Sequence, residues 1–201
     1  MAVTVLSADQ TDDVSAVLCD AFFDYPVMRY VLGGHPHYPR RLRTLVGLFV
    51  ATRDNPNSLM LGVNDKTGTM VAGAMVDLPG ERPVSPALEA LRESVWGELG
   101  ADAQSRYAEY GRIGREHAPH SHHHHLGMIG VRAKAQGTGL GRVLLEYVHG
   151  LAEADPNSTG VSLTTELERN VPLYEHFGYE VSAYARVAPK LETWAMFRPC
   201  P

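Results

Sequence analysis

The chain has 201 residues, 44% apolar and 20% charged, so it can bury a full core, and we expect one domain over residues 1–201. Its formal net charge of −5 gives no overall attraction to nucleic acid or to an anionic membrane. No segment approaches the roughly eighteen apolar residues of a membrane span, and residues 1–6 precede Asp9, Asp12 and Asp13 rather than an apolar signal core. A soluble, cytoplasmic protein is therefore expected.

The N-terminal half alternates short apolar runs with helical patterns. Amphipathic helices repeat apolar side chains every three or four residues, whereas buried strands show short continuous runs. In chain order we expect a strand at 3–6, a helix at 14–22 that stops before Pro26, a helix at 42–50, hairpin strands at 59–63 and 70–76, and helices at 88–99 and 103–116. The last two helices are expected to cover the functional site.

The C-terminal half predicts a second alternation of strands and helices. We expect a strand at 126–131, a helix at 140–151, a strand at 160–165, a short helix from Asn170 to near Gly178, and a closing hairpin of strands 179–187 and 193–198. Asn170 followed by Pro172 is typical of a helix start, with the asparagine as N-cap.

Between the strand at 126–131 and the following helix lies the glycine-rich segment Gln136–Gly141. Glycine lets backbone amides turn toward a ligand, and a helix that starts there adds free N–H groups and the positive end of its dipole. The segment therefore indicates a phosphate-binding loop. Its spacing fits neither the dinucleotide fingerprint nor the triphosphate loop, because the third glycine comes one residue early and Arg142 with Val143 replaces the lysine and hydroxyl.

Gln136, Gly139 and Gly141 form the pattern Gln-x-x-Gly-x-Gly, which resembles the pyrophosphate loop of the GNAT superfamily of N-acetyltransferases. A second motif, residues 170–179, resembles the asparagine-to-Phe-Gly-Tyr segment of the same superfamily. The resemblance implies an α/β GNAT fold, with a mixed, mostly antiparallel sheet flanked by helices. It also implies acetyl-CoA as the acyl donor.

The resemblance further implies which residues hold the cofactor. The strand end would hold pantetheine, the loop and first helical turn would hold pyrophosphate, and the short C-terminal helix would contribute two side chains. The implied cofactor-binding residues are Ile129, Gly130, Val131, Gln136, Gly137, Thr138, Gly139, Leu140, Gly141, Arg142, Asn170 and Tyr174. Asn170 can be a plain helix cap, a cofactor contact, or both.

Over most of its length the chain is most similar to the puromycin N-acetyltransferases, through residues 21–26, 169–174 and 193–194. It departs from them in the strand at 160–165, where Leu163-Thr164-Thr165 replaces their Leu-Glu-Thr and the carboxylate is displaced to Glu166. A base role for this carboxylate therefore does not follow from the resemblance.

Acetylation of an alkyl amine needs a base, because losing the ammonium proton costs about 4 kcal/mol at pH 7. Glu166 and Glu168 lie near the expected acceptor, and each is either a base or a solvated side chain; Glu166 is our candidate catalytic residue. Departure of the thiolate needs a proton or a positive field. Tyr174 is our candidate for the proton, and packing is its alternative role.

The histidine cluster at 120–125 lacks the spacing of a metal site, because alternate side chains of an extended segment point to opposite faces. A solvated loop and strand edge, a site role such as proton relay, and a metal site all stay open, with the solvated loop and strand edge favoured. Cys19 and Cys200 lack partner motifs and are expected to be unpaired thiols. We predict no metal ligands.

These observations predict an enzyme that moves the acetyl group of acetyl-CoA to a primary amine, by direct attack in a ternary complex. A small molecule is the expected acceptor. The alternatives are a protein amine as acceptor and a noncatalytic CoA-binding sensor. Neither nucleic acid nor membrane is expected as a partner, and a homodimer through the sheet edge or the C-terminal hairpin is possible.

Overall fold

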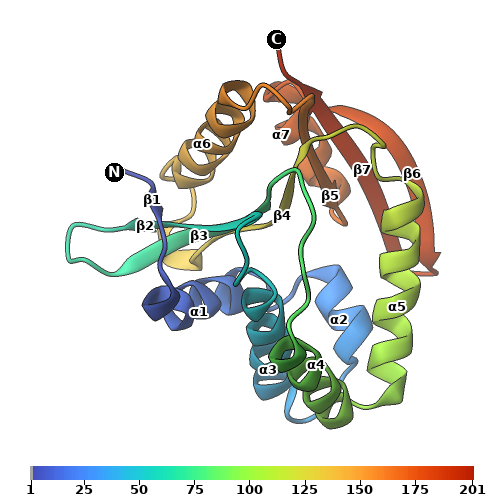
Figure 1. The fold of residues 1–201 in the computed structure, drawn as a ribbon. Coiled ribbons are helices and arrows are strands. Elements are labelled where there is room, and N and C mark those ends of the chain that lie inside the picture. Colours follow the sequence, from blue (N-terminus) through green and yellow to red (C-terminus); the bar gives the residue numbers. More distant parts are fainter. Residues whose placement is uncertain (1) are drawn as a thin grey trace.

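The structure is a computed structural model that describes residues 2–201, except for the side chain of Ala8. Its strands form one seven-stranded sheet in the order β1-β2-β3-β4-β5-β7-β6 (Figure 1). The strands are β1 (Thr4–Val5), β2 (Ser58–Asn64), β3 (Met70–Asp77), β4 (His124–Val131), β5 (Gly160–Thr165), β6 (Glu180–Ala188) and β7 (Leu191–Pro199). The helices are α1 (Thr11–Ala21), α2 (Pro26–Leu32), α3 (Tyr38–Ala51), α4 (Pro86–Leu99), α5 (Ala101–Glu116), α6 (Leu140–Ala154) and α7 (Val171–His176).

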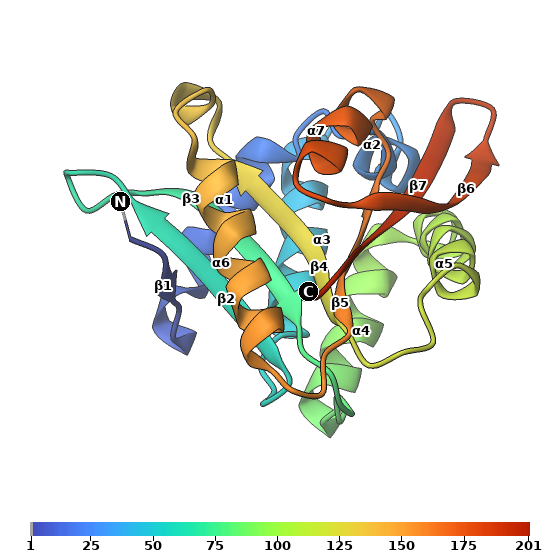
Figure 2. The same ribbon diagram turned by 90° about the horizontal axis from the view of Figure 1, so that it is seen from above.

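The sheet is mixed and mostly antiparallel, as expected. Within residues 2–201, β4 and β5 form the one parallel pair, and the other neighbouring strands pair antiparallel. A parallel pair needs a long crossover. Here α6 forms that crossover and covers the opposite face of the sheet from α1 and α3 (Figure 2).

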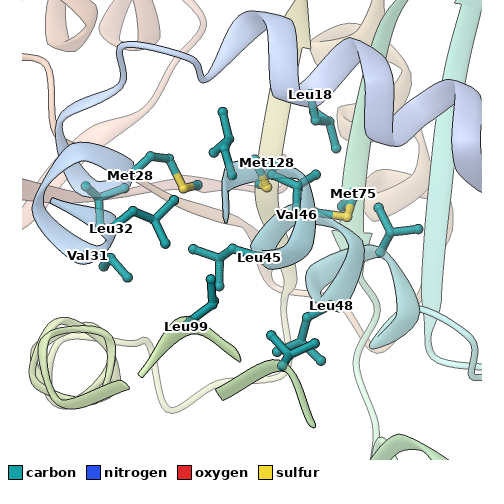
Figure 3. Packing of buried hydrophobic residues seen from close by; sticks show 14 of the residues in the cluster. Leu18, Met28, Val31, Leu32, Leu45, Val46, Leu48, Met75, Leu99 and Met128 are labelled. Carbon is teal, nitrogen blue, oxygen red and sulfur yellow. The ribbon is translucent and has the colours of Figure 1, made fainter. Parts of the chain in front are cut away.

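Two apolar cores lie on the two faces of the sheet. The larger core joins α1 to α5 with side chains of β2, β3 and β4, and the other core joins α6 and α7 with the same sheet. In the larger core the fully buried Leu45 of α3 lies between Leu32 of α2 and Leu99 of α4 (Figure 3). Close packing of this kind makes α2, α3 and α4 a rigid support for whatever they enclose.

The expected elements are present, with one additional helix and two corrections to strand bounds. Pro26 does not simply stop a helix: α1 ends at Ala21, and Pro26 begins the separate helix α2. Proline suits the first helical turn because its fixed φ is already helical and its missing N–H has no acceptor there. Strand β4 begins at His124 rather than at residue 126, and β1 comprises two residues only.

Strands β4 and β5 diverge after a short paired segment. The pairing joins His124–Leu126 to Val161–Leu163, whereas β4 continues to Val131 and β5 to Thr165. On the other side of β4, an irregularity in the β3 register leaves Gly127 without an opposite residue. Such a bulge bends a strand. The two strands therefore open toward their C-terminal ends, as Figure 2 shows.

We expect Gly160→Ala to lower the free energy of unfolding by about 3 kcal/mol or more. Gly160 has φ of +154°, and an added Cβ would lie 2.9 Å from Pro199 Cα of β7. Urea denaturation measures the change. Gly150→Ala on α6, where nothing lies within 4 Å of the added carbon, is the control and should not destabilise. Equal stability of the two variants would contradict the prediction.

Candidate functional site

A cavity of about 950 Å³ lies where β4 and β5 diverge. Its walls come from the α1–α2 segment, the end of α3, the segment after β3, one face of α5, and the strands β4 and β5. Of the two middle helices that were expected to cover the site, α5 lines this cavity through Tyr107 and Tyr110. Among the predicted catalytic residues, both Glu166 and Tyr174 line it.

Glu166 follows β5 directly and lies buried, with 8% of its surface exposed. The Tyr110 hydroxyl donates to Glu166 Oε1 at 2.7 Å, and the Thr193 hydroxyl donates to the same oxygen at 2.9 Å. The Glu166 backbone N–H donates to the Tyr25 hydroxyl at 3.2 Å. The alternative of a solvated Glu166 is therefore wrong, whereas Glu168 is exposed.

Burial is the main cause that raises the pKa of Glu166 above that of an exposed glutamate. The hydrogen bonds that Tyr110, Thr193 and Tyr25 direct to it favour the charged carboxylate and oppose this rise. A raised pKa makes a carboxylate a stronger base. The arrangement thus holds one carboxylate oriented, ionisable and open to the cavity.

Tyr174 lies in α7, with 8% of its surface exposed. Burial first, and the Glu166 charge second, raise the pKa of Tyr174 to about 12. Its ring makes an edge contact with Tyr179, with 5.7 Å between the ring centroids. The hydroxyl therefore stays protonated near neutral pH and can donate a hydrogen bond into the cavity.

Asn170 lines the cavity but does not cap α7, which corrects the expected role. It has helical backbone angles, because a short 3₁₀ turn at Glu168–Asn170 precedes the helix. A capping asparagine needs extended backbone angles to reach the first-turn amides. Its side-chain amide instead donates to Thr165 Oγ1 at 3.3 Å and ties the segment after β5 to the strand.

Three residues at the end of β4 were predicted to bind the cofactor, and they differ in their position relative to the cavity. Ile129 lines the cavity, whereas Gly130 and Val131 lie outside its lining. A Cβ on Gly130 would lie 2.6 Å from Ala21 Cβ of α1, so close packing of α1 on the sheet accounts for this glycine. Ile129 thus stands where the unpaired edge of β4 faces the cavity.

The loop Gln136–Gly141 connects β4 to α6 and lies beyond the end of β4 (Figure 2). Gly137 and Gly139 have φ of +76° and +85°, a conformation that favours glycine. The Gln136 side-chain amide donates to Val131 O at 3.2 Å, and the Thr138 hydroxyl donates to Ala135 O at 2.6 Å. These two bonds hold the loop in shape.

Helix α6 begins at Leu140, so the amides of Leu140, Gly141 and Arg142 belong to its first turn. First-turn amides have no partner within their helix. The Leu140 side chain is buried, whereas the Arg142 side chain forms an exposed ion pair with Glu146 at 2.7 Å. The loop and turn therefore present backbone donors to an anion, and Arg142 contributes its amide rather than a free guanidinium.

The histidine cluster spans a loop and the start of a strand, as expected, but the two histidines in the strand are not solvated. His124 and His125 belong to β4, and their Nδ1 atoms lie 3.0 Å from Ser158 Oγ and 2.8 Å from Ser162 Oγ. Burial lowers the pKa of His125 to about 4, so its ring is neutral near pH 7. His125 also lines the cavity. Over residues 2–201 no group of three potential ligands is arranged to hold a metal ion.

Tyr110, Tyr25 and Thr193 are site residues that the local sequence patterns did not reveal. Tyr110 lies 56 residues before Glu166 and Thr193 lies 27 residues after it. The signal available for Tyr110 is its spacing with Tyr107 and Gly111 on one face of a polar helix. That spacing shows a shared helix face but not what the face meets.

A mixed sheet whose parallel pair diverges, with a glycine loop leading into the crossover helix, defines the GNAT acetyltransferase fold. Residues 98–181 match the family model described as an acetyltransferase (GNAT) domain. The chain therefore has the GNAT fold, and its residues 98–181 are similar to the acetyltransferase (GNAT) family.

Solved structures share this fold over nearly the whole chain. A Corynebacterium glutamicum protein described as histone acetyltransferase HPA2 and related acetyltransferase is 22% identical, with a TM-score of 0.73 over 100% of this chain and 96% of its own. Arylalkylamine N-acetyltransferase 2 from Aedes aegypti is 17% identical, with a TM-score of 0.61 over 99% and 98%. The ribosomal-protein-S18-alanine N-acetyltransferase from Escherichia coli is 15% identical, with a TM-score of 0.58 over 98% and 92%.

At these identities the structural likeness establishes the fold. The closer similarity to the puromycin N-acetyltransferases stays a prediction. In the part of the chain that the structure describes, no helix combines the length and apolarity needed to cross a bilayer.

Proposed function

We propose that this protein transfers the acetyl group of acetyl-CoA to the primary amine of a small molecule, by direct attack in a ternary complex. The observation that supports this most is the buried carboxylate of Glu166, which shares the wall of one cavity with the protonated hydroxyl of Tyr174. One group can accept a proton and the other can donate a hydrogen bond, which are the two tasks of acetyl transfer to an amine.

The chain has backbone groups suited to hold the cofactor. Positive φ at Gly137 and Gly139 and the open space around both glycines suit a backbone cradle for pyrophosphate. The unpaired edge of β4 near Ile129 would hold the pantetheine amides, because a free strand edge offers both donors and acceptors. This arrangement would direct the thioester toward the cavity.

Glu166 would act as the base for the acceptor. An ammonium ion with a pKa near 10 must lose one proton before its nitrogen can attack, at a cost of about 4 kcal/mol at pH 7. A carboxylate whose pKa is raised by burial takes that proton more readily than an exposed one. Tyr110 and Thr193 both bind Oε1, and the second oxygen, Oε2, would accept the proton of the amine.

Tyr174 would stabilise the departing sulfur by hydrogen bonding. Complete proton transfer from a phenol with a pKa of about 12 to a thiolate with a pKa near 8.5 is uphill by roughly 5 kcal/mol. The hydroxyl therefore donates a hydrogen bond as negative charge develops. The attacking nitrogen loses two protons over the reaction: Glu166 passes one to solvent, and the other protonates the CoA sulfur.

The cavity favours a small acceptor. Its volume of about 950 Å³ lies within the range of about 300 to 1,000 Å³ that is usual for small-molecule sites. A protein acceptor would instead need an open groove where α5 stands. The Aedes aegypti enzyme is named for arylalkylamines and the Escherichia coli enzyme for a protein alanine, so the fold itself leaves both classes available.

A thiol-release assay tests the proposal. The protein is incubated with acetyl-CoA and a panel of aminonucleosides, polyamines and amino-terminal peptides, and CoA is titrated separately by calorimetry. Release with one small-amine class supports the proposal, and release with peptides alone would replace it by the protein-acceptor alternative. CoA binding without release on any amine favours the sensor, and failure to bind CoA removes the assignment of the Gln136–Gly141 loop.

Gly139→Ala is expected to weaken CoA binding about tenfold. A non-glycine residue in the left-handed conformation costs about 1–2 kcal/mol, and relief of that strain would turn the loop amides away from the pyrophosphate. Calorimetric titration of CoA measures the effect. Gly68 in the β2–β3 turn has the same φ of +85° and open space around it, so Gly68→Ala is the matched control. Equal CoA affinity in both variants would contradict the role of the loop.

A further inference from the structure

Helix α5 turns one face toward the cavity. Tyr107, Gly111 and Arg115 follow one another at intervals of four residues, and all three line the cavity. Tyr110, which binds Glu166, lies beside them on the same helix. Residues four apart stack along one side of a helix. Along α5, Tyr110 therefore marks the position of the candidate base Glu166, and Arg115 places a cation further toward the C-terminal end of the helix.

Gly111 leaves space that the Arg115 side chain uses. Glycine weakens a helix interior compared with alanine, so its presence there needs a reason. A Cβ on Gly111 would lie 3.3 Å from Arg115 Nη1, and apart from the neighbouring helix backbone no other atom of the described residues lies within 4 Å. Helical side chains lean toward the N-terminus of their helix. The guanidinium of Arg115 thus lies back over Gly111, toward the end of the cavity that holds Glu166.

Arg115 differs from the other arginines of the cavity in its charge partners. Arg53 and Arg82 lie 3.0 Å and 3.9 Å from the buried carboxylate of Asp77. No carboxylate in residues 2–201 lies within 4 Å of the Arg115 guanidinium, although Glu81 is also among the cavity-lining residues. On the same helix, Arg112 pairs with Glu116 instead and does not line the cavity.

The cofactor does not account for this cation. The Gln136–Gly141 loop follows the C-terminal end of β4, whereas the segment after α5 leads into the N-terminal end of the same strand. Eight residues of strand separate the two ends by about 25 Å. Between Tyr110 and Arg115 the helix rises by only about 7.5 Å, which is within the length of a small acceptor molecule.

We propose that the acceptor is a primary amine with an anionic group at its far end, and that Arg115 binds this carboxylate or phosphate while Gly111 keeps the space for the guanidinium. The proposal rests on the proposed function for the placement of the amine at Glu166. A charge-assisted bidentate contact from arginine to either anion supplies both orientation and affinity.

Calorimetric binding to the CoA-saturated protein tests this inference without relying on turnover. The probes are 4-(aminomethyl)benzoate, 4-(aminomethyl)phenylphosphonate and the uncharged 4-methylbenzylamine. We expect the wild type to bind at least one anionic probe about tenfold more tightly than the uncharged one. Arg115→Gln should abolish the preference and Gly111→Ala should reduce it, and the two anions distinguish carboxylate from phosphate recognition.

Two matched variants serve as controls. Arg112→Gln removes a cation from α5 outside the cavity, and Gly97→Ala fills an open helical glycine of α4; both should keep the wild-type preference. Equal affinity of the wild type for charged and uncharged probes, or a preference that survives in Arg115→Gln, overturns the inference. Thiol release with the same amines is measured separately, so loss of charge preference and absence of acetyl transfer are distinguishable results.

Discussion

Replacing Glu166 by glutamine is expected to lower kcat for amine acetylation by a factor of about 10² to 10⁴, the usual contribution of a positioned general base. The substitution removes the basic oxygen but keeps a carbonyl at the position that accepts from Tyr110 and Thr193. The fold should therefore persist, with a melting temperature close to that of the wild type. Steady-state thiol release at saturating amine measures the change.

Glu168→Gln is the matched control for this variant. Glu168 lies two residues further along and is exposed, so its replacement should leave kcat unchanged. A second readout is the pH profile. The base acts only when ionised, so wild-type kcat should fall as the pH decreases through the raised pKa of Glu166, and Glu166→Gln should lack this acid limb. An unaltered profile would remove Glu166 from the mechanism.

Tyr174→Phe is expected to lower kcat about a hundredfold, because one hydrogen-bond donor to developing negative charge is typically worth that much. Phenylalanine keeps the ring and its edge contact with Tyr179, so the wall of the cavity keeps its shape. The affinity for CoA should stay that of the wild type, because the hydroxyl acts on charge that develops only during the reaction. Thiol release and calorimetric titration of CoA measure the two quantities.

Tyr184→Phe provides the comparison for Tyr174. Tyr184 is half-exposed on β6 and donates to Glu192 Oε1 outside the cavity. Its loss should leave turnover and CoA affinity unchanged. If Tyr174→Phe loses CoA affinity and turnover together, its role is structural; if it keeps full turnover, the proton donor or hydrogen-bond donor is another group.

Much of the framework follows from local sequence. Apolar periodicity indicates α3, α4 and α6, and continuous apolar runs indicate β2, β3 and β5. The glycines of the loop at 136–141 indicate a backbone with positive φ, a conformation that other residues avoid. These features depend on residues a few positions apart, so they can be predicted from local sequence without knowledge of the tertiary structure.

The properties of the candidate site depend on residues far apart in sequence. Sequence alone left Glu166 open as a base or a surface side chain, and its burial results from Tyr110 of α5 and Thr193 of β7 meeting it across the sheet. Asn170 is a residue type that often caps helices. Its side-chain amide instead donates to Thr165, because the 3₁₀ turn Glu168–Asn170 precedes α7 and gives Asn170 helical backbone angles.

The position of Arg115 in the cavity likewise depends on the tertiary structure. A polar helix pattern predicts α5, but only the tertiary structure places the Arg115 guanidinium over Gly111 and leaves it without a carboxylate partner in the described chain. Local sequence determines which backbone conformations are accessible. Burial, pKa and charge balance are set by desolvation and by distances between segments, and these exist only once the sheet and its helices have packed.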